Sequence, residues 1–162
     1  MSKQASYDQP VPQQPASLDA DEEALWRALL RVIVTLPRLL DDDLRRTGLS
    51  LSEYAVLMNL SEAPTRELRM SDLAAATELS ASRITRVIDD LQQRGFVSKR
   101  RATEDGRGNV AALTSDGLDA LAKAYPDHLG SARRHVMDHL DPAVTGELAR
   151  QLASVAERLG KR

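Results

Sequence analysis

The sequence predicts a mainly α-helical chain that carries one small β-hairpin. Apolar residues make up 42% of the 162 residues but aromatic residues only 3%, so the core must consist of Leu, Val, Ile and Ala, which suits helix-on-helix packing. From residue 19 onwards, apolar side chains recur mostly at steps of three and four residues, as on one face of a helix. Only residues 96–101 and 109–113 read as strands, and the glycine-containing segment between them predicts a hairpin loop.

Composition excludes several classes of function. The chain has no cysteine, which rules out disulfides, thiolate catalysis and thiolate metal sites. No apolar run approaches the roughly 18 residues of a membrane span and no leader pattern is present, so we expect a cytoplasmic protein without membrane contact. We find no glycine-rich phosphate loop and no nucleophile–base pair, and we interpret Asp41–Asp43 as a solvated acidic run. We therefore expect neither an enzyme nor a cofactor.

The N-terminal part divides into a tail and a long helix. Residues 1–17 are rich in Gln, Pro and Ser, a composition typical of a disordered tail. The helical pattern starts at Asp19 and ends at Gly48. Pro37 lies within this pattern and is expected to interrupt the helix and kink it.

Three shorter helices follow. Ser50 with Glu53 forms a capping-box pattern that opens a helix over 51–61. A short helix is predicted over about 71–77, and another over about 80–94, which begins with a serine suited to capping. A short helix, a turn and a two-faced helix are the components of a helix-turn-helix.

Two helices are expected after the hairpin. One should run from about Ser115 to Leu140, with a bend caused by Pro126 and Gly130. The last should begin near Pro142, and it carries an apolar stripe like a coiled-coil seam, formed by Leu148, Leu152, Val155 and Leu159.

The predicted helix over 80–94 has an apolar side for the core and a polar side suited to DNA. Arginine can bind guanine through two hydrogen bonds, and serine or threonine can contact bases or phosphates. Its first turn can also receive a phosphate on free backbone N–H groups. The polar side chains on or beside the outer face include Ser82, Arg83, Thr85, Arg86 and Asp89. An ordinary solvated helix face has a similar composition, so the next segment is needed to decide.

The basic hairpin that follows favours DNA binding over an ordinary solvated surface, although its charges could also do no more than keep the protein soluble. Residues 80–107 carry a net charge of +3, whereas the whole chain carries −2. A local basic surface of this kind can attract DNA to an acidic protein. Asp105 lies two residues before Arg107 and can orient its guanidinium by a charge-assisted hydrogen bond. The basic residues of the hairpin are Lys99, Arg100, Arg101 and Arg107.

These segments resemble the MarR family of bacterial transcription regulators. Residues 105–114 fit the family's wing pattern D-x-R-x5-L-T. Residues 70–74, 82–91 and 94–97 are similar to the family's helix-turn-helix. The resemblance extends over about residues 20–160.

The resemblance implies a homodimeric, sequence-specific DNA-binding regulator that recognises an inverted-repeat operator in double-stranded DNA. It implies a winged helix-turn-helix lobe over 49–114 and a helical dimerisation region over 18–48 and 115–162. The helix over 80–94 would read the major groove, while Arg107, supported by Asp105, would enter the minor groove. The expected DNA-binding residues are Ser80, Ser82, Arg83, Thr85, Arg86, Lys99, Arg100, Arg101, Asp105 and Arg107.

The resemblance also implies a partner and a ligand. The dimer is expected to form through Leu25, Leu29, Leu148, Leu152, Val155 and Leu159. Many members of the family are repressors that a small aromatic or anionic ligand releases from DNA. The aromatic candidates for contacting such a ligand here are Trp26, Tyr54 and Tyr125.

Two alternatives remain open at this point. His135, Asp138 and His139 have the spacing of one helix face, with His128 two turns earlier, so the chain could be a metal-responsive regulator. Alternatively, carboxylates at Asp89 and Asp90 would repel phosphates, as expected if a winged-helix protein-interaction module had lost DNA binding.

Overall fold

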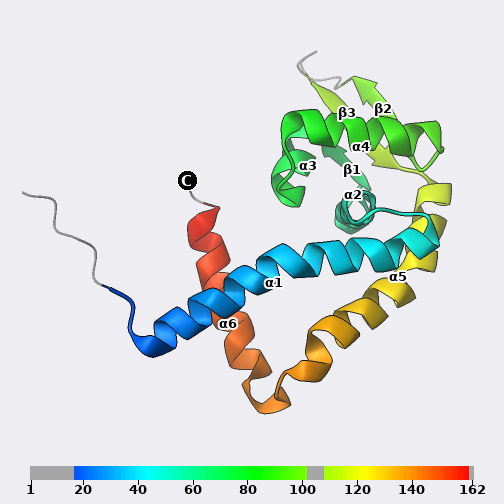
Figure 1. Cartoon of the computed structure of the whole chain (residues 1–162). Coiled ribbons are helices and arrows are strands. Elements are labelled where there is room, and N and C mark those ends of the chain that lie inside the picture. The colour runs from blue at the N-terminus through cyan, green and yellow to red at the C-terminus, as the bar shows by residue number, and fades with distance from the viewer. Residues whose placement is uncertain (1–16, 102–107, 161–162) are drawn as a thin grey trace, which may run out of the picture. The chain divides into compact units, whose positions relative to one another are not determined.

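The computed structural model describes residues 17–101 and 108–160, as six α-helices, two short 3-10 helices and one three-stranded sheet (Figure 1). The chain divides into two compact units, Met1–Val34 and Thr35–Arg162, and we describe each by itself. In chain order the elements are α1 (Ala20–Leu44), η1 (Arg45–Thr47), α2 (Leu51–Glu62), β1 (Glu67–Arg69), α3 (Met70–Thr77), α4 (Ala81–Gln93), β2 (Val97–Arg101), β3 (Asn109–Leu113), α5 (Ser115–His135), η2 (Met137–His139) and α6 (Pro142–Leu159).

Helix α1 differs from the prediction at Pro37. The structure has one continuous helix from Ala20 to Leu44, so Pro37 does not interrupt it. A proline removes a single N–H donor, and a helix of 25 residues retains the hydrogen bonds on both sides of that gap. The helix passes into η1 and ends at Gly48, whose φ of 83° is the left-handed conformation that glycine adopts readily.

Helix α2 starts at the predicted capping box. The Ser50 hydroxyl accepts a hydrogen bond from the Glu53 backbone N–H at 3.2 Å, and the Glu53 carboxylate accepts one from the Ser50 N–H at 2.7 Å. This pair satisfies two backbone donors that a helix start otherwise leaves free. The buried face of α2 then contributes Tyr54, Val56, Leu57 and Leu60 to the core of the second unit.

The sheet contains a strand that the sequence pattern did not predict. Strand β1 pairs with β3 antiparallel, with Leu68 opposite Ala111, and β3 pairs with β2 on its other side, with Lys99 opposite Ala111. Strands β2 and β3 form the predicted hairpin. Three residues are too few to show an alternating pattern, so β1 is recognisable only through its partner strand.

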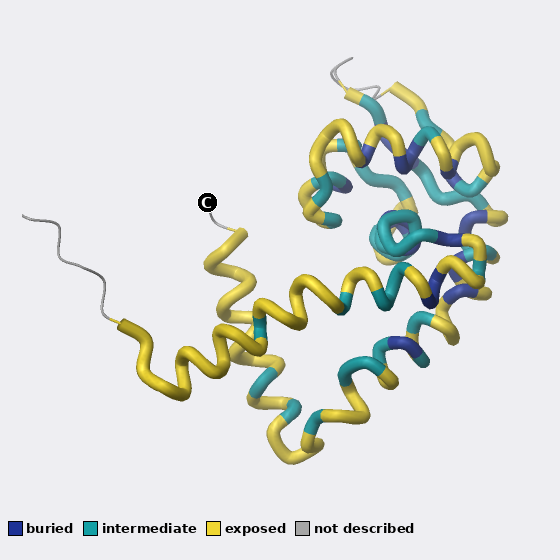
Figure 2. Tube along the Cα trace, viewed as in Figure 1, coloured by how far each residue is buried: buried dark blue, intermediate teal, exposed yellow. Residues whose placement is uncertain are grey.

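Helix α4 is amphipathic as predicted, and Ser80 caps its start, with its hydroxyl accepting a hydrogen bond from the Arg83 backbone N–H. Figure 2 shows buried positions on the side of α4 that faces the core and mostly exposed positions elsewhere along it. The buried residues of α4 are Ile84, Val87, Ile88 and Leu91. The opposite, polar side of the helix is therefore left for a partner.

The helix predicted over 115–140 is shorter in the structure. Helix α5 ends at His135, because Val136 leaves the helical conformation with φ −134° and ψ −65°. Pro126 and Gly130 both lie within α5 and do not end it. Helix α6 begins at the predicted Pro142, capped by the Asp141 carboxylate, and no residue of α6 is buried (Figure 2).

The start of α5 lies very close to the start of β2. The Thr114 hydroxyl accepts a hydrogen bond from the Gly117 N–H at 3.1 Å and donates one to the Gly95 carbonyl at 2.7 Å. A Cβ atom on Gly117 would lie 2.1 Å from the Phe96 carbonyl oxygen. Glycine is therefore required here for α5 to pack against the backbone that leads into the hairpin.

Among the helices that the structure describes, none has the length and apolar character needed to cross a membrane.

Candidate nucleic-acid interface

The outer face of α4 presents polar side chains to solvent, as the sequence predicts. Ser82, Thr85 and Arg86 are exposed. The Thr85 hydroxyl donates to the Ala81 carbonyl at 2.9 Å, and the Ser82 hydroxyl lies 3.2 Å from that of Ser80. Arg86 has no hydrogen bond or ion pair with any other described residue, so its guanidinium keeps its donors for a ligand such as a guanine edge or a phosphate.

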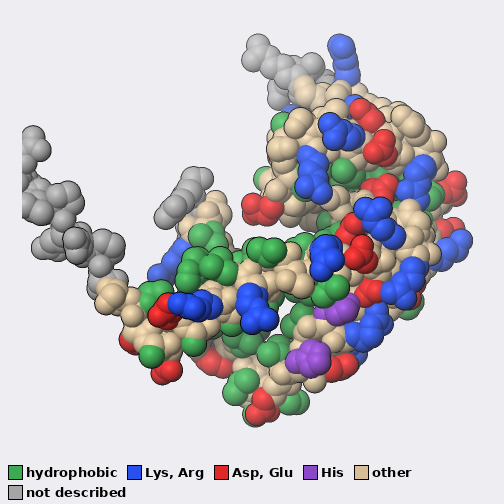
Figure 3. Space-filling model, viewed as in Figure 1, with side chains coloured by type: hydrophobic (Ala, Val, Ile, Leu, Met, Phe, Trp, Pro, Cys, Tyr) green, Lys and Arg blue, Asp and Glu red, His purple; other side chains and the backbone are tan. Residues whose placement is uncertain are grey.

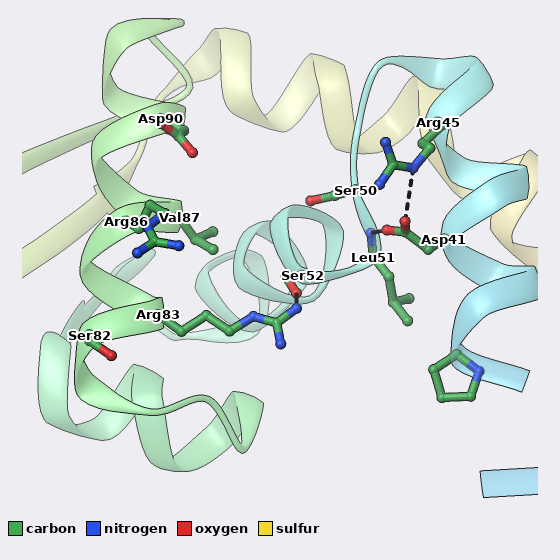
Figure 4. A pocket seen from close by; sticks show the side chains of 11 residues that line it. Asp41, Arg45, Ser50, Leu51, Ser52, Ser82, Arg83, Arg86, Val87 and Asp90 are labelled. Atoms are coloured by element: carbon green, nitrogen blue, oxygen red, sulfur yellow. Dashed lines mark hydrogen bonds and ion pairs between the residues drawn. The ribbon is translucent and has the colours of Figure 1, made fainter. Parts of the chain in front are cut away.

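Arg83 is in a different situation from Arg86, although both were predicted to contact DNA. Its guanidinium Nη2 donates a hydrogen bond to the Ser52 hydroxyl at 3.0 Å. Figure 4 shows the Arg83 side chain extending from α4 across to α2, whereas the Arg86 guanidinium stays beside α4. The structure thus separates two arginines that the sequence pattern treats alike.

Arg83 crosses a crevice of about 540 Å³ within the second unit. The crevice lies between the C-terminal part of α1, the start of α2 and the side of α4 (Figure 4). Three guanidinium groups, three hydroxyls and two carboxylates line it, which gives it a mixed but cation-rich surface. Its lining residues are Pro37, Asp41, Arg45, Ser50, Leu51, Ser52, Ser82, Arg83, Arg86, Val87 and Asp90.

Asp41, on the α1 side of this crevice, differs from the sequence prediction of a solvated charge. Its carboxylate accepts a hydrogen bond from the Leu51 N–H at 2.8 Å and another from Arg45 Nε at 2.9 Å. The hydrogen bond from Leu51 is the main reason that the pKa of Asp41 is lowered, and the charges of Arg45 and Arg83 lower it further. Asp41 therefore joins α1 to the start of α2.

Asp43 makes the corresponding connection to α5. Its buried carboxylate oxygen Oδ2 accepts hydrogen bonds from the Ser131 hydroxyl at 2.6 Å, from Arg134 at 2.9 Å and from His135 Nε2 at 2.9 Å. Arg46 pairs with the other oxygen. The Ser131 and His135 hydrogen bonds hold the pKa of this carboxyl well below its usual range. The interpretation of the acidic run as merely solvated is therefore wrong for Asp43 as well.

Two of the predicted wing cations are paired with carboxylates. Lys99 Nζ donates to Asp89 Oδ1 at 2.8 Å, which links β2 to α4. Arg100 pairs with Glu67 on β1. The exposed Arg101 ends β2, while Asp105 and Arg107 lie outside the described residues. Both basic and acidic side chains are visible around α4 in Figure 3, so the described part of this face is not uniformly positive.

Arg94 fixes the end of α4, a role that sequence reasoning missed. Its guanidinium donates to the Glu53 carboxylate at 2.8 Å and to the Gly48 carbonyl at 2.9 Å, and it lies 4.6 Å from the centre of the Phe96 ring. An arginine that makes two hydrogen bonds and stacks on a ring cannot be replaced equally well by lysine. Arg94 thereby holds α4 against the start of α2.

The histidines do not form the shared face that a metal site requires. His135 ends α5 and bonds Asp43, whereas His139 lies in η2 and its Nε2 is 3.0 Å from the Arg134 carbonyl oxygen. The assumption of one helix through both residues is wrong, because the backbone turns at Val136. Across residues 17–101 and 108–160, no three His, Cys, Asp or Glu side chains are grouped so that they could hold a metal ion.

The aromatic residues proposed for ligand contact lie in different environments. Tyr54 is 3% exposed, and its ring centre lies 4.3 Å from that of His128. Burial raises the pKa of Tyr54 to about 12 and lowers the pKa of His128. Neither the Tyr54 hydroxyl nor His128 Nδ1 has a hydrogen-bond partner among the described residues. Tyr125 is half exposed, and so is Trp26, which belongs to the first unit.

The residues proposed for the dimer interface are mostly uncovered in the single chain. On α6, Leu152, Val155 and Leu159 are 47%, 50% and 65% exposed, and Leu148 is partly buried. In the first unit Leu25 is exposed and Leu29 is partly buried. A run of exposed leucine and valine along one helix is typical of an interaction surface.

Comparison with known proteins agrees with this geometry. The sequence model that describes the MarR family matches residues 47–108 of this chain, which include α2, α3, α4 and β2. A curated relative, the HTH-type transcriptional repressor YetL of Bacillus subtilis, is 28% identical over 144 residues, which cover 89% of this chain and 86% of the relative.

Solved structures are similar over nearly the whole chain. AbsC, a MarR family transcriptional regulator from Streptomyces coelicolor, is 37% identical with a TM-score of 0.82, and the match covers 91% of this chain and 99% of AbsC. Sco3205, a MarR family transcriptional regulator from the same organism solved in complex with DNA, is 32% identical with a TM-score of 0.83, covering 91% and 92%. On this likeness, together with the two-faced α4 and the adjoining hairpin, the chain belongs to the MarR family of DNA-binding transcriptional regulators.

Proposed function

We propose that this protein is a homodimeric repressor that reads an inverted-repeat operator with α4. The observation that carries the proposal is the exposed face of α4, where Arg86 has no partner among the described residues and stands beside Ser82 and Thr85. Arginine that is free to make two parallel hydrogen bonds is the side chain best suited to a guanine edge in the major groove. Repression is suggested by the relative YetL, which is a transcriptional repressor.

We further propose that residues 49–114 form the DNA-binding lobe and that 18–48 and 115–162 form the dimerisation region. The lack of any buried residue on α6 supports this division, because a helix with exposed Leu152 and Val155 gains stability when a second copy covers it. Two copies related by a twofold axis would present two α4 helices, and such dimers bind half-sites about one helical turn apart.

A small anionic ligand in the crevice would release the repressor from DNA. The crevice supports this proposal because Arg83 and Arg86 belong both to its lining and to α4. An anion paired with these two guanidinium groups would compete with DNA for Arg86. Some proteins of this fold are known with small molecules bound, as CouR from Rhodococcus jostii is with p-coumaroyl-CoA, although at 24% identity that likeness concerns the fold alone.

The test is selection of bound duplexes from a randomised DNA pool, with the mass of the protein in solution measured in parallel. The expected result is a dimer that enriches an inverted repeat. Arg86→Ala should lose the base preference at one position of each half-site, at a cost of about 1–3 kcal/mol per contact. Arg107→Ala should weaken binding to all duplexes and reduce the salt dependence, as the loss of a backbone or minor-groove contact would.

Arg133→Ala is the matched control, because Arg133 is an exposed arginine on α5, and the one ion pair that it makes with a described residue, Asp138, is long at 3.6 Å. It should leave the selected sequence and the affinity unchanged. A folded dimer that enriches no sequence would contradict the proposal and favour a protein-interaction module instead. A monomer that enriches a single half-site would contradict the dimer alone.

A further inference from the structure

The two arginines on the crevice side of α4 differ in what holds them. Arg86 has no partner among the described residues, whereas Arg83 is bound to Ser52, a residue 31 positions earlier on a different helix. A free arginine samples many rotamers, but a guanidinium that donates to a fixed hydroxyl is restricted to those rotamers that reach it. The constraint on Arg83 therefore comes from α2 and not from α4.

Ser52 is well suited to act as this fixed acceptor. It lies in the first turn of α2, and the helix start is held by the Ser50–Glu53 capping box and by the Asp41 carboxylate on the Leu51 N–H. Ser52 itself takes no part in that capping, so its hydroxyl is available to Arg83. The nearby carboxylate of Asp41 attracts the Arg83 guanidinium in the same direction.

We propose that Ser52 is a positioning residue that keeps Arg83 away from the base edges, so that Arg86 is the only arginine of α4 that reads a base. This inference rests on the proposed DNA-reading role of α4. The sequence pattern predicts that both Arg83 and Arg86 contact DNA, whereas here only Arg86 contacts a base. Each half-site of the selected operator should then contain one guanine position that depends on an α4 arginine, and not two.

Loss of the Ser52 hydroxyl would release Arg83. Arg83 lies one helical turn before Arg86, at the N-terminal end of α4, which is the end of a recognition helix that contacts bases. A released guanidinium there can reach a guanine next to the one that Arg86 reads. The Ser52→Ala variant should therefore gain a base preference that the wild-type protein lacks.

The experiment compares the sequences selected by the full-length wild type, Ser52→Ala, Arg83→Ala and the double variant. Arg83→Ala should select the wild-type sequence. Ser52→Ala should add a guanine preference of about fivefold or more at one further position of each half-site, the discrimination expected of a bidentate arginine contact. The double variant should return to the wild-type sequence, because the new preference depends on Arg83.

The conservative Ser52→Thr variant retains a hydroxyl and should behave as wild type. Alanine is favoured over serine inside a helix, so Ser52→Ala is expected to fold, and a thermal unfolding curve checks this. The proposal is overturned if Arg83→Ala alone alters the selected sequence, or if Ser52→Ala selects the wild-type sequence. If the wild type itself selects no sequence, the proposed function fails, which is a distinguishable result.

Discussion

Replacing Gly117 with alanine tests how closely α5 packs against the hairpin lobe. An alanine Cβ would lie 2.1 Å from the Phe96 carbonyl oxygen and 2.9 Å from a methyl carbon of Leu113. The Phe96 carbonyl oxygen also accepts the Thr114 N–H hydrogen bond at 3.1 Å, so it cannot move without weakening that bond. The backbone itself must shift by about 1 Å to restore an ordinary contact distance.

The expected change in stability is the balance of three contributions. Overpacking of this kind costs about 1–3 kcal/mol. Weakening the Thr114 hydrogen bond costs about 1 kcal/mol more. Alanine is favoured over glycine within a helix by about 1 kcal/mol. Gly117→Ala should therefore lower the free energy of unfolding by about 1–3 kcal/mol, which corresponds to a fall in Tm of roughly 2–12 °C for a chain of this size.

The assay is urea unfolding followed by far-UV circular dichroism, at one protein concentration because dimer stability depends on it. Gly146→Ala is the matched control: Gly146 lies in α6, and its added Cβ would meet only the end of the Arg150 side chain, at 3.9 Å. That variant should be more stable than wild type by up to about 1 kcal/mol. Equal stabilisation by both substitutions would refute the close approach of α5 to Phe96.

Three further outcomes are expected. Leu152→Asp combined with Val155→Asp should convert the dimer to a monomer, because the two charges would lie in an apolar interface. Light scattering measures the mass, and a persistent dimer would show that α6 is not the interface. The pKa of Asp43 is lowered on folding, so its stabilising contribution is present above about pH 4, where the unfolded carboxyl is ionised, and is lost as the pH falls through the folded-state pKa. Urea unfolding of Asp43→Asn should therefore show a weaker loss of stability below pH 4 than wild type; an identical acid profile would contradict this role. Arg94→Lys should lower the thermal midpoint nearly as much as Arg94→Ala, because lysine cannot make both hydrogen bonds and the ring contact; full stability of the lysine variant would show that charge alone suffices.

Local patterns predicted those parts of the fold whose hydrogen bonds close within a few residues. The capping box at Ser50 and Glu53 places the start of α2, and Ser80 places the start of α4. The 3.6-residue periodicity of α4 separates its core side from its polar side. In each case the partners lie at most four residues apart, so the sequence contains the whole interaction.

Other features depended on partners far away along the chain. Strand β1 has three residues and exists through its pairing with β3, more than 40 residues later. The end of α5 at His135 coincides with no proline or glycine, and His135 there bonds Asp43, 92 positions earlier. The acidic run appeared solvated for the same reason, because nothing near it in the sequence shows that its carboxylates would be buried or bonded.

The sequence by itself determined the helical fold class, the helix-turn-helix with its hairpin, and the family. These follow from periodicity, capping and motif spacing, which are short-range properties of a chain. Only the tertiary structure decided which of the predicted DNA-binding side chains are free. It paired Lys99 with Asp89 and Arg83 with Ser52, and it left Arg86 without a partner among the described residues. Residue type shows that a guanidinium can bind DNA, but whether it is available depends on which acceptors the fold brings within 3 Å of it.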